Sequence, residues 1–502
     1  MNILHNRSTL LIAGVLVLAA SAFFAAHANA SVVTYPMPSG GIPRSNDFSV
    51  SVDGNNVDVY SVGVSPNAFP ACTGSEDHAS MAYFDFSGSV NVQITSSVAI
   101  SSAVVRPLRL GINPSISGNT VSFPLSQPAN LSVEINGDEI HNLNLFANPI
   151  ESGSTNATYY FGPGVHGDGS RIYLNPGESV YIAGGAVVYG VIRSSGVGNY
   201  SVRGRGILSG EKNLNLICGY GDPATTSFVD LQGGGAINLE GIIGLDPSSW
   251  AYIVAGDSIN VDNIKLIGFR HNSDAIDIIH TNSATIKNVF LRTQDDHIAI
   301  KNDPYFMDQT GKPTQNVWVE DSVLWPASHA ISFMEQSGSI NNINFKNIDI
   351  IHSYRGDIIW AEGGTNIDGV TMDDIRIENV GPNVSNIFAL NSGFNNAYIN
   401  NVQVLGGSSA PSTINTVYPN YYSANITFNN LNYFGNYILS ASQGQFTIGS
   451  NANIDFTQGG ATPPTPSTPS CHILDSSQAV PTGFGASYNV LSSAQELLLK
   501  AN

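Results

Sequence analysis

Residues 261–289 read VDNIKLIGFRHNSDAIDIIHTNSATIKNV, a stretch that begins and ends with the same pattern. In Val261-Asp262-Asn263-Ile264 and again in Ile286-Lys287-Asn288-Val289, an apolar residue precedes a polar pair whose second member is Asn, and another apolar residue follows. Four more copies, with Asn or Asp at the marked position, follow towards the C-terminus at Phe345–Ile348, Met372–Ile375, Ile399–Val402 and Phe428–Leu431. The marked polar residues are 25, 59, 27, 27 and 29 positions apart. The interval of 59 splits in two if Asp321 marks an irregular copy, and Leu239-Glu240-Gly241-Ile242 extends the series backwards by 22.

This spacing predicts a β-solenoid. A period of 20 to 30 residues with one apolar strand core per unit is typical of that architecture, in which each unit forms one coil and its apolar residues fill the interior. We expect the Asn at each turn to stack on the Asn of the coil below and to form hydrogen bonds along the axis. A sandwich or a propeller is the alternative, but neither requires the register to persist over six units.

The composition supports an all-β chain. Only 11 % of the 502 residues are charged, and 50 are Gly, a profile that suits short strands joined by tight turns better than a helix bundle. The formal net charge of −19 argues against nucleic acid or an anionic membrane surface as a partner, because both require basic patches. It also argues, less strongly, against an anionic substrate.

The first thirty residues are predicted to be a signal peptide. Arg7 gives a positive start, Leu10–Ala26 is apolar, and Ala28-Asn29-Ala30 matches the small-x-small cleavage rule, so the mature chain should begin at Ser31. No later stretch approaches twenty apolar residues, so we expect a secreted protein, extracellular or periplasmic, that is not held in a membrane. A retained N-terminal anchor is the alternative.

Four further segments are predicted. Residues 31–150 hold seven short β-prone runs separated by turns such as Asp53-Gly54, which indicate a small N-terminal β-sandwich. Leu143–Pro149 is interpreted as the exit into the solenoid, which comprises residues 151–456. We expect the sandwich to cover the exposed first coil of the solenoid. A glycan-binding role for the sandwich is the alternative. Residues 457–470 form a Pro/Thr/Ser/Gly linker, and residues 471–502 form a C-terminal tail.

The three cysteines do not predict a metal site. Cys72, Cys218 and Cys471 are an odd number, so at least one is unpaired or pairs between molecules. Their spacing matches no metal-binding pattern, and we expect no metal and no cofactor.

Three aspartates carry the chemical signal. Asp274 and Asp295 are 21 residues apart, close to one coil, and Asp296 follows directly. Because equivalent positions on successive coils lie about 4.8 Å apart, the three carboxylates should gather on one wall. Crowding of like charges should leave one carboxyl protonated to a higher pH beside an ionised one, the pair that glycoside cleavage requires. Turn capping and calcium binding are alternative roles for such a cluster.

The sequence around these aspartates resembles a known family. Ser248-Ser249-Trp250, the run Asn272–Asp277 and the run Gln294–Lys301 look like the active-site coils of the polygalacturonase family of pectin-degrading hydrolases. The resemblance covers roughly residues 160 to 450, and a looser one exists to the dextranase and isopullulanase family. It implies a right-handed parallel β-helix, with Asp295 as the general acid. It also implies that Asp274 and Asp296 hold and deprotonate the attacking water, which inverts the anomeric carbon.

Two further positions bear on the substrate. His329 falls where the polygalacturonase pattern has a Gly-His-Gly histidine that helps to hold the protonation state of the acid, although the flanking glycines are absent. The Arg-Ile-Lys triplet that pairs with the sugar carboxylate in that family is replaced here by Ile358-Ile359-Trp360. A galacturonate carboxylate would then be poorly paired, whereas Trp360 could stack on a neutral sugar ring. Candidate contacts at other positions are Trp250, Arg270, Lys301 and Arg355.

Three functional hypotheses result. The first is a secreted, monomeric glycoside hydrolase that cleaves α-glycosidic bonds in a polysaccharide by a three-aspartate inverting mechanism, with a neutral α-glucan of the dextran type favoured. The second is a divergent pectin-type hydrolase that binds carboxylate through Arg270, Lys301 or Arg355. The third, of another class, is a non-catalytic glycan-binding β-helix.

Overall fold

The structure is a computed structural model that describes residues 30–65, 77–212, 227–302, 312–335, 338–362, 366–416 and 423–460. The predicted signal peptide apart from Ala30, most of the predicted linker, the whole C-terminal tail and all three cysteines lie outside these ranges. Within them, no helix is long and apolar enough to cross a membrane.

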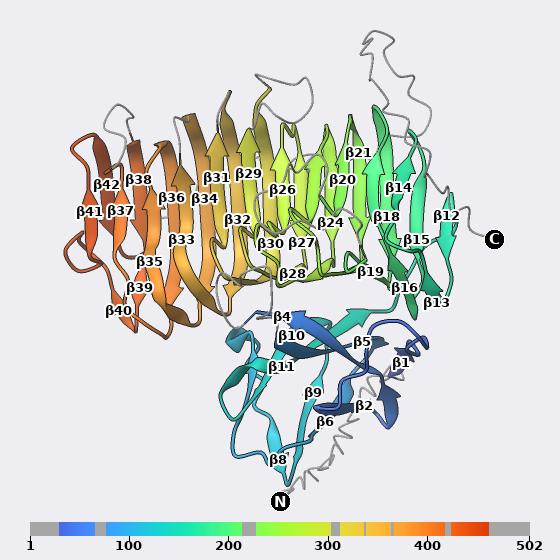
Figure 1. Cartoon of the computed structure of the whole chain (residues 1–502). Helices are drawn as coiled ribbons and strands as arrows, with labels where there is room; N and C mark the ends of the chain where they lie inside the picture. Colours follow the sequence, from blue (N-terminus) through green and yellow to red (C-terminus); the bar gives the residue numbers. More distant parts are fainter. Residues whose placement is uncertain are drawn as a thin grey trace, which may run out of the picture.

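The larger part of the chain is a parallel β-helix, as predicted (Figure 1). One wall is an eleven-stranded sheet in which every strand pairs in parallel with the next. Its strands are β14 (Arg171–Leu174), β17 (Val191–Ser194), β20 (Val229–Gln232), β23 (Tyr252–Ala255), β26 (Ile276–Ile279), β29 (Ile298–Asn302), β31 (Ile331–Glu335), β33 (Ser353–Glu362), β35 (Val380–Leu390), β37 (Ser412–Ile414) and β41 (Phe446–Ile448).

The rest of the coil wall is a twenty-stranded sheet, parallel except for the terminal β39–β40 hairpin. Its strands are β12 (Tyr159–Phe161), β13 (Gly164–His166), β15 (Ser179–Ile182), β16 (Ala186–Tyr189), β18 (Gly198–Gly204), β19 (Ile207–Ser209), β21 (Gly234–Glu240), β22 (Ile243–Leu245), β24 (Ser258–Asp262), β25 (Lys265–Ile267), β27 (Ala284–Lys287), β28 (Phe290–Thr293), β30 (Thr314–Pro326), β32 (Ile340–Ile350), β34 (Asn366–Ile377), β36 (Gly393–Val404), β38 (Ser423–Asn429), β39 (Asn432–Tyr433), β40 (Asn436–Tyr437) and β42 (Ala452–Thr457).

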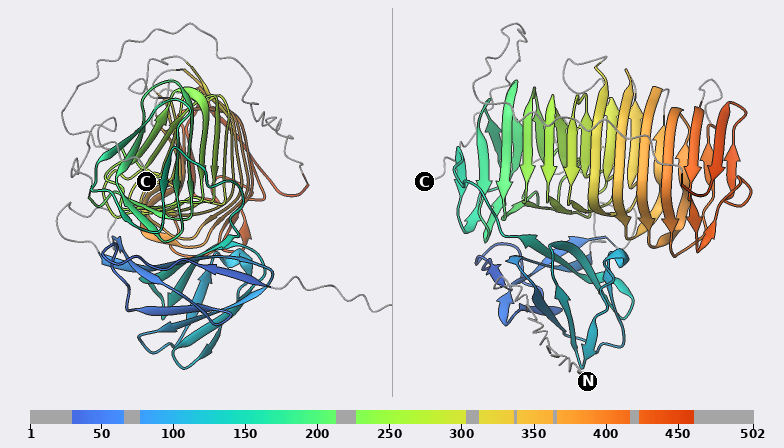
Figure 2. Two further views of the ribbon diagram at one scale, coloured as in Figure 1. Left: turned by 90° about the vertical axis from the view of Figure 1, so that its right-hand side faces the viewer. Right: turned by 180° about the vertical axis from the view of Figure 1, so that it is seen from behind.

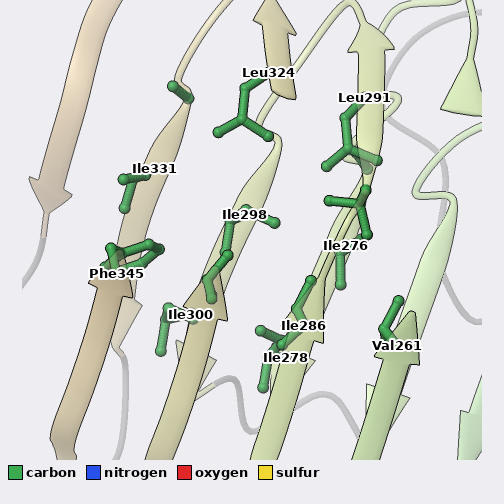
Figure 3. Close-up of a cluster of buried hydrophobic side chains, with 14 of the residues drawn as sticks. Val261, Ile276, Ile278, Ile286, Leu291, Ile298, Ile300, Leu324, Ile331 and Phe345 are labelled. Carbon is green, nitrogen blue, oxygen red and sulfur yellow. The ribbon is translucent and has the colours of Figure 1, made fainter. Parts of the chain in front are cut away.

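The interior of the β-helix is apolar and in register from coil to coil. Ile276, Ile298 and Ile331 pair across β26, β29 and β31, and all three are fully buried (Figure 3). Burial of each such side chain contributes about 1.5–3 kcal/mol. Because every second residue of a strand faces the interior, the residues between them are presented on the outer wall.

The recurring Asn and Asp residues form the turns of the coils. The marked positions Asn263, Asn288, Asp321, Asn347, Asp374, Asn401 and Asn430 all have φ between 52° and 62°. This left-handed conformation strains most side chains, whereas Asn, Asp and Gly tolerate it. The predicted stacking between successive turns is confirmed where Asn347 Nδ2 donates to Asp321 Oδ1 and where Asn430 Nδ2 donates to Asn401 Oδ1. Asp321 is therefore a regular member of the series.

The N-terminal strands form two sheets that share one apolar core. The five-stranded sheet contains β3 (Asn55–Val57), β2 (Phe48–Val52), β6 (Val90–Ser96), β9 (Thr120–Leu125) and β8 (Ser115–Ser117). The six-stranded sheet contains β1 (Ser31–Thr34), β5 (Asp77–Ser87), β11 (Asp138–Pro149), β10 (Ala129–Ile135), β7 (Ala103–Arg106) and β4 (Val59–Val64), and a 3-10 helix, η1 (Leu108–Leu110), follows β7. Leu143–Pro149, interpreted as the exit into the solenoid, belongs to β11, the last strand of the N-terminal sheets; it pairs with β10 and β5, and the next strand along the chain is β12 of the β-helix.

The expectation that the sandwich covers the first coil is also wrong. The sandwich packs against the side of the β-helix along several coils (Figures 1 and 2). Tyr60, Met81 and Phe146 contribute to this interface from the sandwich. Buried residues that face outward from successive coils meet them, namely Val187, Ile207, Ile243, Ile267, Phe290, Val323 and Ile351. The sequence pattern does not distinguish these outward apolar residues from core residues.

Candidate active site

Successive coils of the eleven-stranded wall align the acidic residues in a column. Ile276 pairs with Ile298, and the amide of Ala275 donates to the carbonyl of Asp296, so Asp274 lies opposite Asp296. The coil between them is therefore 22 residues long. The equivalent of Asp274 on the next coil is therefore Asp296, and not Asp295 as the sequence spacing suggested. His329 continues the column, because the amide of His297 donates to its carbonyl.

All of these side chains avoid the apolar interior. Ile276 and Ile278 face inward, so Asp277 between them faces the outer wall, and Lys301 does the same one coil further on. Asp274 and Asp296 are each 4 % exposed, whereas Asp295 is partly exposed. Of the three aspartates, Asp295 is thus the one that a bound molecule reaches most easily.

Lys301 is the centre of a buried ion cluster. Its Nζ lies 2.7 Å from Asp274 Oδ2 and 2.7 Å from Asp277 Oδ1. The ammonium also lies 3.3 Å from the centroid of the Trp250 ring, a cation–π contact. Lys301 is only 1 % exposed. Its ammonium therefore holds the side chains of Asp274 and Asp277 in place. Because Lys301 is buried, its position does not support the expected contact with a sugar.

One ammonium shared by two carboxyls leaves negative charge in excess. Burial raises the pKa of Asp274 well above its usual range, and it raises the pKa of Asp277 to about 6, while Lys301 opposes both shifts. The two carboxylates outweigh the effect of burial on Lys301, whose pKa is raised. A calcium ion, the alternative considered for this cluster, would have to displace the ammonium from its place between the two carboxyls.

His329 holds Asp296 in its ionised form. Nδ1 of His329 lies 2.6 Å from Asp296 Oδ1. Burial alone would raise the pKa of Asp296, but the charge and hydrogen bond of His329 outweigh it and lower that pKa to about 2. The pKa of His329 is raised in return, because Asp296 outweighs the effect of burial. The Trp360 ring stacks on the imidazole at 4.5 Å between centroids and 7° between planes.

The pKa of Asp295 is shifted in the opposite direction from that of Asp296. Burial raises its pKa to about 7, and the negative charge of Asp296 adds to the shift. The positive charges of His329, Lys301 and Arg355 oppose the shift without cancelling it. At mildly acidic pH the wall therefore presents a protonated carboxyl directly beside an ionised one, which is the requirement for paired general acid and base chemistry.

Of the two arginines predicted to contact the substrate, Arg355 acts on the aspartate column, whereas Arg270 pairs with an aspartate outside it. Arg355 lies close enough to act on two groups: burial and the charge of Arg355 lower the pKa of His271, and the same charge opposes the rise in the pKa of Asp295. Arg270 instead forms a two-pronged ion pair with Asp246, with both N···O distances at 2.9 Å. Its guanidinium is therefore committed to a partner away from the aspartates.

Trp360 and Trp250 both lie on the outer wall next to the acidic column. Trp360 alternates with the buried Ile359 and Ala361 in β33, so it is not a core residue, and its ring stacks on the imidazole of His329. One face of Trp250 is covered by Lys301. Each ring therefore contacts one of the titratable groups of the site, Trp360 with His329 and Trp250 with Lys301.

Sequence reasoning did not assign Asp357 to the site. By the register of β31 and β33, Asp357 occupies the next position of the column after His329, and its charge contributes to the raised pKa of that histidine. Asn386 of the following coil donates to its carboxylate at 2.7 Å. Its spacing of 28 residues from His329, which matches the solenoid repeat, is a signal that could have identified it.

These features define a parallel β-helix with an acidic site on its outer wall, and one solved structure shares this fold. Dex49A from Penicillium minioluteum matches with 15 % identity and a TM-score of 0.57, over 85 % of this chain and 96 % of that one. A family 28 exopolygalacturonase from Yersinia enterocolitica matches with 9 % identity and a TM-score of 0.40, over 73 % and 96 %. No protein-family profile matches the chain, and no curated relative was found. The chain thus has the right-handed parallel β-helix fold of Dex49A, as the sequence predicted.

Proposed function

We propose that the chain is an exported glycoside hydrolase that cleaves α-glycosidic bonds in a polysaccharide with inversion. The observation that carries this proposal is that His329 Nδ1 lies 2.6 Å from Asp296 Oδ1 and favours the ionised form of that carboxyl, whereas burial raises the pKa of the adjacent Asp295 to about 7. The predicted signal peptide supports an extracellular or periplasmic location. The fold shared with the dextranase Dex49A over 96 % of that chain is consistent with this assignment.

In the proposed mechanism each carboxyl has one task. Asp295 donates its proton to the glycosidic oxygen while the bond from that oxygen to the anomeric carbon breaks. Asp274 and Asp296 hold a water on the opposite face of the sugar, and Asp296 accepts its proton as the new bond to the anomeric carbon forms. The product then carries the inverted configuration. Proton exchange with solvent returns Asp295 and Asp296 to their starting states.

The surroundings of the site favour a neutral sugar. Of the three cations considered for a sugar carboxylate, Arg270 is paired with Asp246, and Lys301 is buried between Asp274 and Asp277. Arg355 is partly exposed, and its charge acts on Asp295. A buried carboxylate without its partner costs about 2–5 kcal/mol. We therefore propose a neutral α-glucan of the dextran type, and Arg355 is the feature that keeps a pectin-type substrate as the second candidate.

A substrate panel tests this choice. Purified protein should release reducing ends from dextran, and the rate on polygalacturonate should be at least tenfold lower under the same conditions. Pullulan distinguishes the linkage within neutral α-glucans. Release from polygalacturonate alone would overturn the neutral-glucan assignment in favour of the pectin-type one, and Arg355→Gln should then abolish that release.

The pH profile tests the role of His329. Because the imidazolium lowers the pKa of both Asp296 and Asp295, its removal in His329→Gln should raise both values. The acidic limb of kcat/KM reports ionisation of Asp296, and the basic limb reports deprotonation of Asp295, so both limbs should move to higher pH. His166→Gln, a substitution in β13 far along the chain from the site, is the control and should leave the profile unchanged. Limbs that stay in place in His329→Gln would contradict the assignment.

A further inference from the structure

Three potential metal ligands converge on the surface of the sandwich. Asp77 and His78 begin β5, and His141 lies in the parallel neighbour β11. Nε2 of His141 lies 3.0 Å from Asp77 Oδ1, and Nδ1 of His78 lies 3.5 Å from the same oxygen. All three ligand atoms lie within 4.8 Å of one another. The ligands are up to 64 residues apart in sequence, which explains why no spacing in the sequence predicted a metal.

Both imidazoles are held by a second carboxylate through their other nitrogen. Nδ1 of His141 lies 2.8 Å from Asp138 Oδ2, and Nε2 of His78 lies 3.0 Å from Asp47 Oδ2. In metal sites a carboxylate on the far ring nitrogen fixes the tautomer and leaves the other nitrogen as a ligand. Here the remaining nitrogen of each ring, Nε2 of His141 and Nδ1 of His78, faces one aspartate oxygen, Asp77 Oδ1. Two independent carboxylate–histidine pairs aimed at one point are more than a chance gathering of acidic residues.

The spacing and the charge both suit zinc. Bonds of 2.0–2.2 Å in a tetrahedron place neighbouring ligand atoms about 3.3–3.5 Å apart, close to the 3.0 and 3.5 Å observed here. Within the described ranges, the ion pairs of Asp47, Asp77 and Asp138 are all formed with the two histidines. With neutral imidazoles these three carboxylates would carry an excess of negative charge, which a divalent cation offsets.

We propose that Asp77, His78 and His141 bind a divalent transition-metal ion of the zinc type, with Asp47 and Asp138 as orienting partners. Three protein ligands leave a fourth position for water, and the side chains of the ligands are 33–49 % exposed, so the ion can enter from solvent. Asp47 directly precedes β2 of the five-stranded sheet, whereas the ligands belong to the six-stranded sheet. The bound ion would therefore connect the two sheets of the sandwich.

Calorimetric titration of the chelator-treated, full-length protein with Zn²⁺ tests the proposal. The wild type should bind one ion at this site. His78→Gln and His141→Gln should each weaken binding more than about 100-fold, and Asp138→Asn should weaken it about 10- to 100-fold, the usual effect of losing an orienting partner. His166→Gln removes a histidine elsewhere and should leave the affinity unchanged. Thermal unfolding in chelator should occur at the wild-type temperature for the exposed-site variants, which shows that they fold.

The identity and geometry of the ion are tested with Co²⁺ and Ca²⁺. Co²⁺ should give the strong visible absorption of a four-coordinate site in the wild type and not in His141→Gln. Ca²⁺ should fail to displace Zn²⁺, because it prefers six to eight oxygen ligands. The proposal is overturned if the wild type binds no Zn²⁺ saturably, if the histidine variants bind it as tightly as the wild type, or if Ca²⁺ competes equally.

Discussion

Asp295→Asn is expected to lower kcat/KM by a factor of about 10²–10⁴, the contribution of a positioned general acid. The amide keeps the size of the carboxyl but cannot supply the proton that the leaving oxygen requires. Because Asp295 is partly exposed and outside the apolar core, the folded structure should be preserved. Reducing-end assays on dextran measure the rate, and circular dichroism confirms the fold. An aryl glycoside with an acidic leaving group should lose much less rate, since it needs little protonation.

Asp321→Asn is the matched control for this substitution. It makes the same chemical change at a turn of the solenoid where the side chain accepts a hydrogen bond from Asn347, a role that Asn can also perform. Its activity should equal that of the wild type. If Asp295→Asn also retained full activity, the non-catalytic glycan-binding hypothesis would be favoured instead.

Lys301→Met is expected to lower the free energy of unfolding at neutral pH by about 3–5 kcal/mol. Removal of one partner from a buried ion cluster leaves uncompensated charge, and here both Asp274 and Asp277 lose the ammonium at 2.7 Å. Methionine fills a similar volume, so the loss is electrostatic rather than a cavity effect. Denaturant unfolding at several pH values measures it.

The pH dependence of this loss has a definite sign. Without Lys301 the pKa values of the two carboxyls rise further above their unfolded values in the folded state. A carboxyl whose pKa is higher in the folded state than in the unfolded state, where it is about 4, lowers the free energy of unfolding at pH values above about 4. This loss of stability grows as the pH rises and levels off above the pKa of the folded state. The deficit of Lys301→Met should thus be large at pH 7 and small at pH 4. The double variant Asp277→Asn/Lys301→Met should recover part of it, and an equal deficit at both pH values would contradict this account.

The solenoid could be predicted because its turns impose a residue type. A left-handed turn in every coil selects Asn, Asp or Gly, and Asn263, Asn288 and Asn347 stand at those turns. The aspartate column could be predicted only to within one residue. Coil lengths vary from 22 residues between Asp274 and Asp296 to 33 between Asp296 and His329, so no single period fixes the register.

The directions in which side chains point could not be predicted from the sequence. Lys301 follows the apolar Ile300 in the strand, and nothing in that pattern says whether its ammonium meets solvent or two buried carboxyls. The position of the sandwich was missed for a similar reason. Outward-facing Ile243 and inward-facing Ile242 are equally apolar and equally buried in the structure, but the first packs on the sandwich and the second on the core.

The configuration of the first product tests the three-carboxyl site most directly. Proton NMR can follow the new reducing ends of dextran before they mutarotate. If Asp274 and Asp296 direct water to the face of the sugar opposite the leaving oxygen that Asp295 protonates, the β-anomer should appear first. First appearance of the α-anomer would mean that one of these carboxyls attacks the sugar itself, and the arrangement proposed for the three residues would be wrong.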